Sequence, residues 1–164
     1  MKTIKIDGTE IGFDQPPYVI AELSGNHNGS IERAIDIIDF VKTSGARAVK
    51  LQTYRPDTIT LKSDLPDFQI KDGLWAGRSL WDLYEWAHTP WEWHNPLFEH
   101  AKKREITMFS SPFDTTAVDL LEDLNAPAYK IASFEAVDLQ LIRYAASTGK
   151  PMIISTGMAD QDEV

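Results

Sequence analysis

The sequence predicts an α/β fold in which parallel strands alternate with helices. Two observations predict it: five short apolar runs have the length of buried strands, and segments with helical periodicity separate them. Strands and helices in alternation form a parallel sheet with right-handed crossovers. Such a sheet is either open and doubly wound or part of a (β/α)₈ barrel of the TIM type.

An antiparallel hairpin is predicted before the first of these strands. Thr3 to Phe13 alternate apolar and polar residues around Asp7-Gly8, a dipeptide that suits a type I′ turn because both positions tolerate positive φ. The strands expected after it are Tyr18–Leu23, Ala46–Gln52, Ile106–Ser110, Ala128–Ser133 and Met152–Ser155.

Four helices connect the strands in this scheme. The first has an apolar stripe from Ile31 to Val41 and stops at Ser44-Gly45. The second follows Thr89–Glu92, a predicted capping box with Thr89 as N-cap, and runs to about Lys103. The third begins after Asp114 and the fourth at about Leu139. The stretch from Thr53 to Pro90 is too long for an ordinary connection, and long loops of this kind usually carry function.

The composition limits the classes of partner. The 164 residues have 43% hydrophobic and 25% charged residues, which predicts one domain with a packed core. A formal charge of -9 disfavours nucleic acids and anionic membranes as partners. The sequence has no cysteine, no signal-peptide pattern and no apolar run of about 18 residues. We therefore expect a soluble, cytoplasmic protein.

Each predicted strand ends in polar residues, and ligands bind at this carboxyl edge in both parallel architectures. Two lysines, several hydroxyls and a Ser-Thr-Gly turn suit a phosphate or a carboxylate. The strand-end residues are Glu22, Ser24, Asn26, His27, Lys50, Gln52, Ser110, Ser111, Asp114, Lys130, Ser133, Glu135, Ser155, Thr156 and Gly157.

Side-chain alternation places both lysines on the inner face of the sheet. Lys50 shares a strand face with Ala46, Ala48 and Gln52, and Lys130 shares one with Ala128 and Ala132. A lysine between small residues in a buried strand is more often a ligand than a solvated charge. An anionic small substrate is expected.

The histidines and tryptophans allow more than one interpretation. His27 fits a polar turn better than a metal site, and His88 and His94 fit capping or packing better than a zinc pair. All five tryptophans lie between residues 75 and 93. They predict a packed lid or a subunit contact, with a sugar-stacking role open for one of them.

Five ordered motifs resemble the sialic acid synthase family. They are AELSGNHNG at residues 21–29, VKLQTY at 49–54, FSSPFD at 109–114, YKIASFE at 129–135 and ISTGM at 154–158. Within the family, GLW at 73–75, LYE at 83–85 and TPWEWH at 89–94 look most like the pseudaminic acid synthases, with N-acetylneuraminate and legionaminate synthases as alternatives.

The resemblance implies a condensation. Phosphoenolpyruvate attacks the aldehyde of an N-acetylated amino sugar, 2,4-diacetamido-2,4,6-trideoxyaltrose in the pseudaminic branch, and a nonulosonic acid and phosphate result. The carboxylates for proton transfer would be Glu22 and Glu135, with their roles left open. Substrate binding would fall to Lys50, Gln52, Ser110, Lys130, Ser133, Ser155 and Gly157.

The chain departs from the family pattern in length. Family members have a complete (β/α)₈ barrel and a small antifreeze-like domain, and they form homodimers. Residues 1–14 would be the hairpin and 15–164 the first five strands of a truncated barrel in a single partial domain. The histidines that bind manganese or magnesium in the family lie in later strands, so we expect no metal ligands in this chain and no turnover by it alone.

Two other hypotheses stay open. The chain could be a non-catalytic half-barrel that self-associates through its open strand edges. It could also be an unrelated barrel such as a class I aldolase, with Lys130 as the Schiff-base residue.

Overall fold

A computed structural model describes residues 3–157 and 159–163. The amino-terminal hairpin is confirmed: β1 (Ile4–Ile6) pairs antiparallel with β2 (Thr9–Ile11). Asp7 and Gly8 both have positive φ, 48° and 76°, as a type I′ turn requires. Residues 1 and 2 of the predicted hairpin segment and Met158 of the last predicted motif lie outside the described residues.

All five predicted strands are present and pair in parallel. They are β3 (Ile20–Glu22), β4 (Ala48–Thr53), β5 (Thr107–Pro112), β6 (Tyr129–Ile131) and β7 (Met152–Ile154). Their order in the sheet is the order in the chain, β3-β4-β5-β6-β7. A doubly wound sheet reverses its strand order, so this topology is that of a half-barrel.

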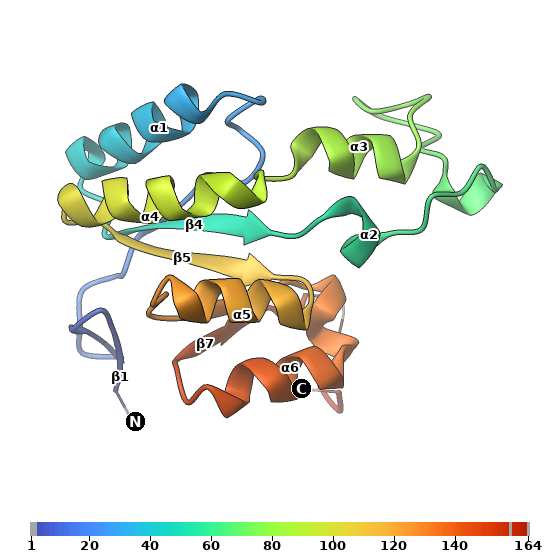
Figure 1. The fold of residues 1–164 in the computed structure, drawn as a ribbon. Coiled ribbons are helices and arrows are strands. Elements are labelled where there is room, and N and C mark those ends of the chain that lie inside the picture. The colour runs from blue at the N-terminus through green and yellow to red at the C-terminus, as the bar shows by residue number, and fades with distance from the viewer. Residues whose placement is uncertain (1–2, 158, 164) are drawn as a thin grey trace.

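The four predicted helices lie on the outer face of the sheet. They are α1 (Ile31–Ser44), α4 (His94–Lys103), α5 (Thr115–Asp123) and α6 (Leu139–Ser147). In Figure 1, α1 and α4 lie above β4, and α5 and α6 lie below β5. Ser30 caps α1 by accepting from Arg33 N at 3.2 Å, and Gly45 ends it at φ 84°. No helix among the described residues combines the length and the apolar character needed to cross a bilayer.

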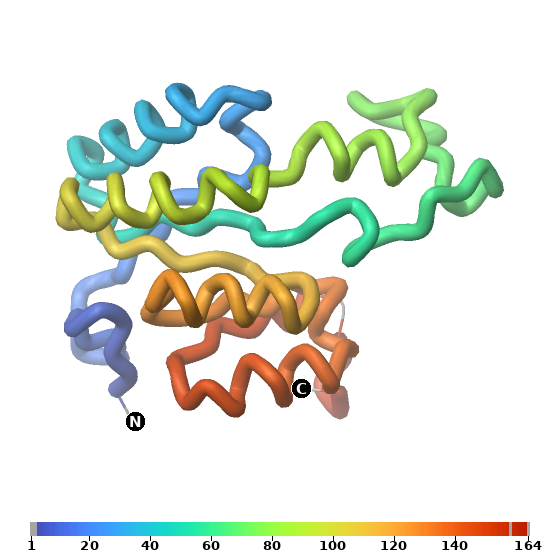
Figure 2. The backbone as a smooth tube through the Cα atoms, viewed as in Figure 1, coloured from blue at the N-terminus to red at the C-terminus, as the bar shows by residue number. Residues whose placement is uncertain are grey.

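The segment between β4 and α4 contains more structure than the sequence predicted. It holds α2 (Pro56–Ile59), the 3₁₀ turn η1 (Pro66–Phe68) and α3 (Leu80–Ala87). Ser79 caps α3 by accepting from Asp82 N at 3.1 Å, and Leu80, Leu83, Tyr84 and Ala87 recur at helical spacing on one half-buried face. Figure 1 places α2 and α3 beyond the carboxyl ends of β4 and β5, and the trace between them extends away from the sheet in Figure 2.

The predicted capping box at Thr89 is wrong. A 3₁₀ turn, η2 (Trp91–Trp93), precedes α4, which begins at His94. Thr89 Oγ1 is buried and has no hydrogen-bond partner among the described residues. The ring of His94 contacts the Pro90 and Trp91 carbonyls at 3.2 and 3.3 Å, so the helix starts later than the capping pattern indicates.

Alternation along the strands sorts the core into an outer and an inner part. Val49, Leu51 and Met108 pack outward beneath α1 and α4. Ala48, Phe109 and Ala128 face inward, where Ile6 of the hairpin covers them. The hairpin therefore fills the inner face near the strand starts and leaves the carboxyl ends of the strands free.

Phe109 is the largest side chain in this inner cluster and is fully buried. Phe109→Ala should lower the free energy of unfolding by about 3 to 5 kcal/mol, because the inner face cannot collapse around the lost ring. Phe40→Ala is the matched control, since Phe40 on α1 is 71% exposed. Urea denaturation of both variants checks the prediction, and equal losses of stability would contradict the assigned inner core.

Candidate active site

Lys50 lies inside the curve of the sheet beside a carboxylate from the neighbouring strand. It is only 7% exposed, and its Nζ lies 2.7 Å from Glu22 Oε2. The parallel register sets Glu22 directly opposite Lys50, which explains the contact. Lys50 Nζ also donates to Ser111 Oγ at 3.4 Å. The prediction that Lys50 faces inward is confirmed.

Lys130 lies two strands away on the same inner face. Its Nζ donates to Ser155 Oγ at 2.7 Å and to the Ile131 carbonyl at 2.8 Å. Burial and then the charge of Lys50 lower the pKa of Lys130, while Glu22 and Glu135 oppose this shift. These four side chains therefore lie within electrostatic range of one another at the carboxyl edge.

Ser133 and Gly157 bring the loops after β6 and β7 together beside Lys130. A Cβ atom on Gly157 would lie 3.3 Å from Ser133 Oγ, closer than most such contacts in proteins. The loops can approach this closely because residue 157 has no side chain.

The structure places Ser110 outside this group. Ser110 and Thr53 lie on the outer face of the sheet, where their hydroxyl oxygens are 2.6 Å apart and Thr53 Oγ1 is 2.9 Å from His94 Nε2. Ser111, the next residue, points inward to Lys50. Alternation from the inward-facing Phe109 could have identified Ser111 as the hydroxyl at this site.

A pocket of about 790 Å³ opens beside these strand ends. Gln52 lines it and accepts from Ser24 Oγ at 2.7 Å, which fixes the orientation of its amide. The pocket is lined by Ser24, Gly25, Asn26, Asn28, Gln52, Tyr54, Ile59, Leu74, Trp75, Leu83, Tyr84, Trp86, Ala87, Phe113, Ala132, Phe134 and Glu135.

Aromatic side chains form one wall of the pocket. Tyr54 packs edge-on against Tyr84 and Phe113 at centroid distances of 5.7 and 5.3 Å. Trp75 and Trp86 pack on each other at 5.1 Å. Tyr54 directly follows β4, Phe113 lies in the loop after β5, and Trp75, Tyr84 and Trp86 belong to the long segment before α4, so residues distant in sequence form the wall jointly.

Three tryptophans do not line this pocket. Trp91 lies beneath the Arg55 guanidinium at 4.6 Å, Trp93 packs edge-on against His27 at 5.4 Å, and Lys62 lies over Trp81 at 5.4 Å. Packing thus accounts for these three, while a role at the pocket stays open for Trp75 and Trp86.

Glu135 is the carboxylate that lines the pocket. Its Oε2 atom is buried and has no hydrogen-bond partner in the part of the chain that the structure describes. Burial raises the pKa of Glu135, although the Lys130 charge opposes the shift. Burial, followed by the charge of Glu135, also raises the pKa of Tyr84. Burial therefore favours the protonated form of Glu135, whereas Glu22 is ion-paired with the Lys50 ammonium.

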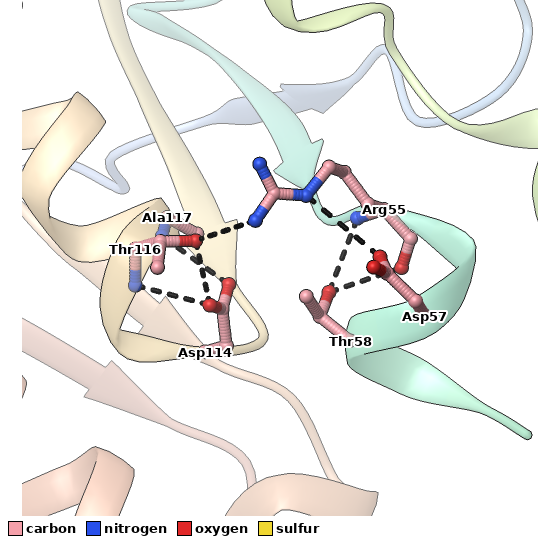
Figure 3. Close-up of polar contacts among 6 residues, drawn as sticks. All are labelled: Arg55, Asp57, Thr58, Asp114, Thr116 and Ala117. Carbon is pink, nitrogen blue, oxygen red and sulfur yellow. Dashed lines mark hydrogen bonds and ion pairs between the residues drawn. The ribbon is translucent and has the colours of Figure 1, made fainter.

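Arg55 connects the segment after β4 to the start of α5 (Figure 3). Its Nη2 donates to Thr116 Oγ1 at 3.1 Å, and its Nε lies 3.8 Å from Asp57 Oδ1. Asp114 caps α5 and accepts from Thr116 Oγ1 at 2.6 Å. Arg55 belongs to none of the sequence motifs, and its partners lie on different elements.

The contacts of His27 and His88 are local hydrogen bonds and not those of a metal site. His27 is buried and its Nδ1 accepts from Gly29 N at 3.1 Å, and His88 Nδ1 lies 2.7 Å from the Glu85 carbonyl. Within residues 3–157 and 159–163, no three His, Cys, Asp or Glu side chains are grouped so as to hold a metal ion.

Comparison with known proteins gives consistent results. The profile of the NeuB family matches residues 37–164. Pseudaminic acid synthases from Campylobacter jejuni and Helicobacter pylori are 50% and 51% identical over 92% of the chain. A crystal structure of N-acetylneuraminic acid (sialic acid) synthetase from Leptospira borgpetersenii superposes with a TM-score of 0.84 at 26% identity, over 99% of this chain and 52% of that one. The chain spans 44% of the length of the two pseudaminic acid synthases.

The burial of the His94 imidazole predicts that the free energy of unfolding depends on pH. Burial lowers the pKa of His94 from 6.5 to about 4, against the opposing effect of the Pro90 and Trp91 carbonyls. Between pH 6.5 and about 4 the imidazole is protonated in the unfolded state but neutral in the folded state. The free energy of unfolding therefore has its full value above pH 6.5 and decreases as the pH falls toward 4.

His94→Gln removes this titration. From pH 7 to pH 5 the wild type should lose about 2 kcal/mol more of its free energy of unfolding than the variant loses. Urea denaturation at the two pH values measures the difference, with His100→Gln on the same helix as control. Parallel losses in wild type and His94→Gln would contradict the depressed pKa.

Proposed function

The chain belongs to the NeuB family, and on that premise we propose that its protein condenses phosphoenolpyruvate with an N-acetylated amino sugar to a nonulosonic acid. The observation that carries the proposal is the convergence of Lys50 and Lys130 on the inner face of the sheet, each with a serine hydroxyl at its ammonium group. Phosphoenolpyruvate carries a phosphate and a carboxylate. Two ammonium groups on separate strands suit these two anions.

The binding residues proposed for phosphoenolpyruvate follow from the strand ends. Lys50 and Ser111 would hold one anionic group, and Lys130 and Ser155 the other. Ser133 and Gly157 adjoin the second pair, where the missing side chain of Gly157 lets the Ser133 hydroxyl approach the site. Ser110 is not part of this proposal, because it lies on the outer face with Thr53 and His94.

The two carboxylates suit opposite proton transfers. C3 of phosphoenolpyruvate bonds to the aldehyde carbon, whose oxygen takes a proton, and water adds at C2 before phosphate leaves with C–O cleavage. Glu135, whose pKa is raised by burial, would donate the proton to the aldehyde oxygen. Glu22, ion-paired with Lys50, would accept the proton of the attacking water.

The pocket beside Gln52 is proposed to bind the sugar. Gln52 would contact a polar substituent, and the wall of Tyr54, Tyr84, Trp75 and Trp86 would pack against apolar ones. The sugar of the pseudaminic branch, 2,4-diacetamido-2,4,6-trideoxyaltrose, carries three methyl groups that suit such a wall. Identities of 50% and 51% to pseudaminic acid synthases support this choice over the legionaminate and N-acetylneuraminate alternatives.

The divalent cation that the family resemblance implies has no ligand set among the described residues. A homodimer and a cytoplasmic location stay predictions.

Self-association is a second candidate function, favoured by one observation. Apolar residues that flank β7, the last strand of the described sheet, are exposed: Phe134, Val137, Leu139 and Ile154. A second copy could cover them. Size-exclusion chromatography with light scattering decides this point, because a monomer at every concentration would contradict it.

The condensation is tested by phosphate release from phosphoenolpyruvate with manganese and each of three sugars. The diacetamido trideoxyaltrose should be the preferred substrate over N-acetylmannosamine and the legionaminate precursor. The assay is made on a protein of the relatives' length and on the 164 residues alone. Release of phosphate with none of the sugars by the longer protein would reject the proposed function.

Binding of phosphoenolpyruvate should depend on both lysines. Lys50→Ala and Lys130→Ala should each weaken it by about 2 to 5 kcal/mol, because an anion in a water-poor site loses a partner charge. Lys42→Ala is the control, since Lys42 pairs with Glu105 at 3.6 Å on the outer surface. Calorimetry measures the affinities, and unchanged binding in both lysine variants would refute the assignment.

A further inference from the structure

His94 lies behind the pocket, on the side of β4 that faces the helices. It is fully buried at the first turn of α4. Its Nδ1 lies 3.2 Å from the Pro90 carbonyl and 3.3 Å from the Trp91 carbonyl, and its Nε2 lies 2.9 Å from Thr53 Oγ1. Both ring nitrogens therefore have partners, and only one of these partners belongs to the sheet.

The partners fix the direction of every hydrogen bond in this chain of contacts. A carbonyl oxygen only accepts, so Nδ1 of His94 carries the proton and Nε2 is the acceptor. The Thr53 hydroxyl then donates to Nε2, and the Ser110 hydroxyl donates to Thr53 Oγ1 at 2.6 Å. The result is one directed path from β5 through β4 to α4.

This path acts where the backbone pairing of β4 and β5 becomes weaker. Thr53 stands opposite Pro112 in the register, and proline has no backbone N–H to donate. Ser110 lies two residues before Pro112 on β5, and its hydroxyl and that of Thr53 supply a bond between the strands near this point. Without the Thr53 hydroxyl, the end of β4 would lose its side-chain hydrogen bonds to β5 and to α4.

Thr53 separates two residues of the pocket. Gln52 and Tyr54 line the pocket on the inner side, while Thr53 points outward to His94. A rotation of the Thr53 backbone would move both neighbours. On the inner side, Ser24 holds the amide of Gln52, and Tyr84 and Phe113 pack against the ring of Tyr54. On the outer side, the same stretch of backbone is held through Thr53.

The surroundings of His94 contain few charges. Glu92 and His88 are the titratable groups with an electrostatic effect on it, and Trp91 separates it from the Arg55 guanidinium. Trp93 holds the same turn against His27 in the loop after β3. The turn before α4 is thus fastened to the ends of both β3 and β4.

We propose that His94 is a positioning residue that acts through Thr53 to hold Gln52 and Tyr54 in place at the sugar pocket. This inference rests on the proposed function for its kinetic consequence, but its structural consequence stands independently. His94 touches no substrate in this scheme. Its loss should therefore alter sugar use and leave phosphoenolpyruvate binding unchanged.

Substitution of His94 by glutamine or by asparagine tests the hydrogen bonds of the two ring nitrogens separately. Glutamine at position 94 can place an acceptor near the former Nε2 and keep the bond from Thr53, whereas asparagine reaches only the former Nδ1 position. We expect His94→Asn and Thr53→Val to raise the sugar KM about tenfold, the factor for one lost hydrogen bond of ordinary strength. His94→Gln should restore it to within about twofold, and the phosphoenolpyruvate KM should not move in any variant.

His100→Asn and His100→Gln are the matched controls. His100 lies on the same helix and bonds Asp39 at 2.8 Å, but it faces α1. Neither control should change the sugar KM. Should His94→Asn fail to fold, Thr53→Val carries the same test, since valine keeps the shape of threonine.

Hydrogen–deuterium exchange of residues 50–54 gives a readout that does not need turnover. The amides there should exchange about tenfold faster in His94→Asn and Thr53→Val than in wild type or His94→Gln. Faster exchange in a protein without condensation activity would support the positioning role and reject the proposed function. Equal exchange and equal sugar KM in His94→Asn and His94→Gln would overturn the inference.

Discussion

The burial of the Lys50 ammonium inside the curve of the sheet is the constraint on which the site depends. A charge removed from water must be paired and hydrogen-bonded, or the fold loses several kcal/mol. Here the parallel register brings Glu22 opposite Lys50, and alternation along β5 brings Ser111 to the same point. The small residue Ala48 below Lys50 on the same face leaves room for its stem. One buried cation thus links the pairing of three strands to the chemistry at their ends.

Much of this arrangement could be predicted because it follows from local rules. Apolar runs located the strands, the Asp7-Gly8 pair located the hairpin, and alternation placed Lys50 and Lys130 inward. The choice between a doubly wound sheet and a barrel could not come from these patterns, because both have the same β-α alternation. The motifs and then the strand order decided it in favour of a half-barrel.

The parts that sequence reasoning missed depend on contacts between distant segments. Nothing near Ser110 in the sequence reveals that its partner is Thr53, 57 residues away, or that Thr53 in turn contacts His94. The capping pattern at Thr89 is an ordinary local signal for a helix start. The His94 ring nevertheless contacts the Pro90 and Trp91 carbonyls, and α4 begins only at His94. Helix α3 is an exception, because its N-cap Ser79 and its apolar stripe of Leu80, Leu83, Tyr84 and Ala87 are local signals within the segment predicted as one long loop.

The identity of strand order and chain order has a consequence for how the chain folds during synthesis. Each new strand of the sheet finds its partner already made, so the sheet can grow from β3 to β7 by addition at one edge. The hairpin is the exception. Thr107 donates to Asp7 at 2.8 Å across 100 residues of sequence. The hairpin therefore leaves the ribosome before the sheet does but can cover the inner face only after β5 has emerged.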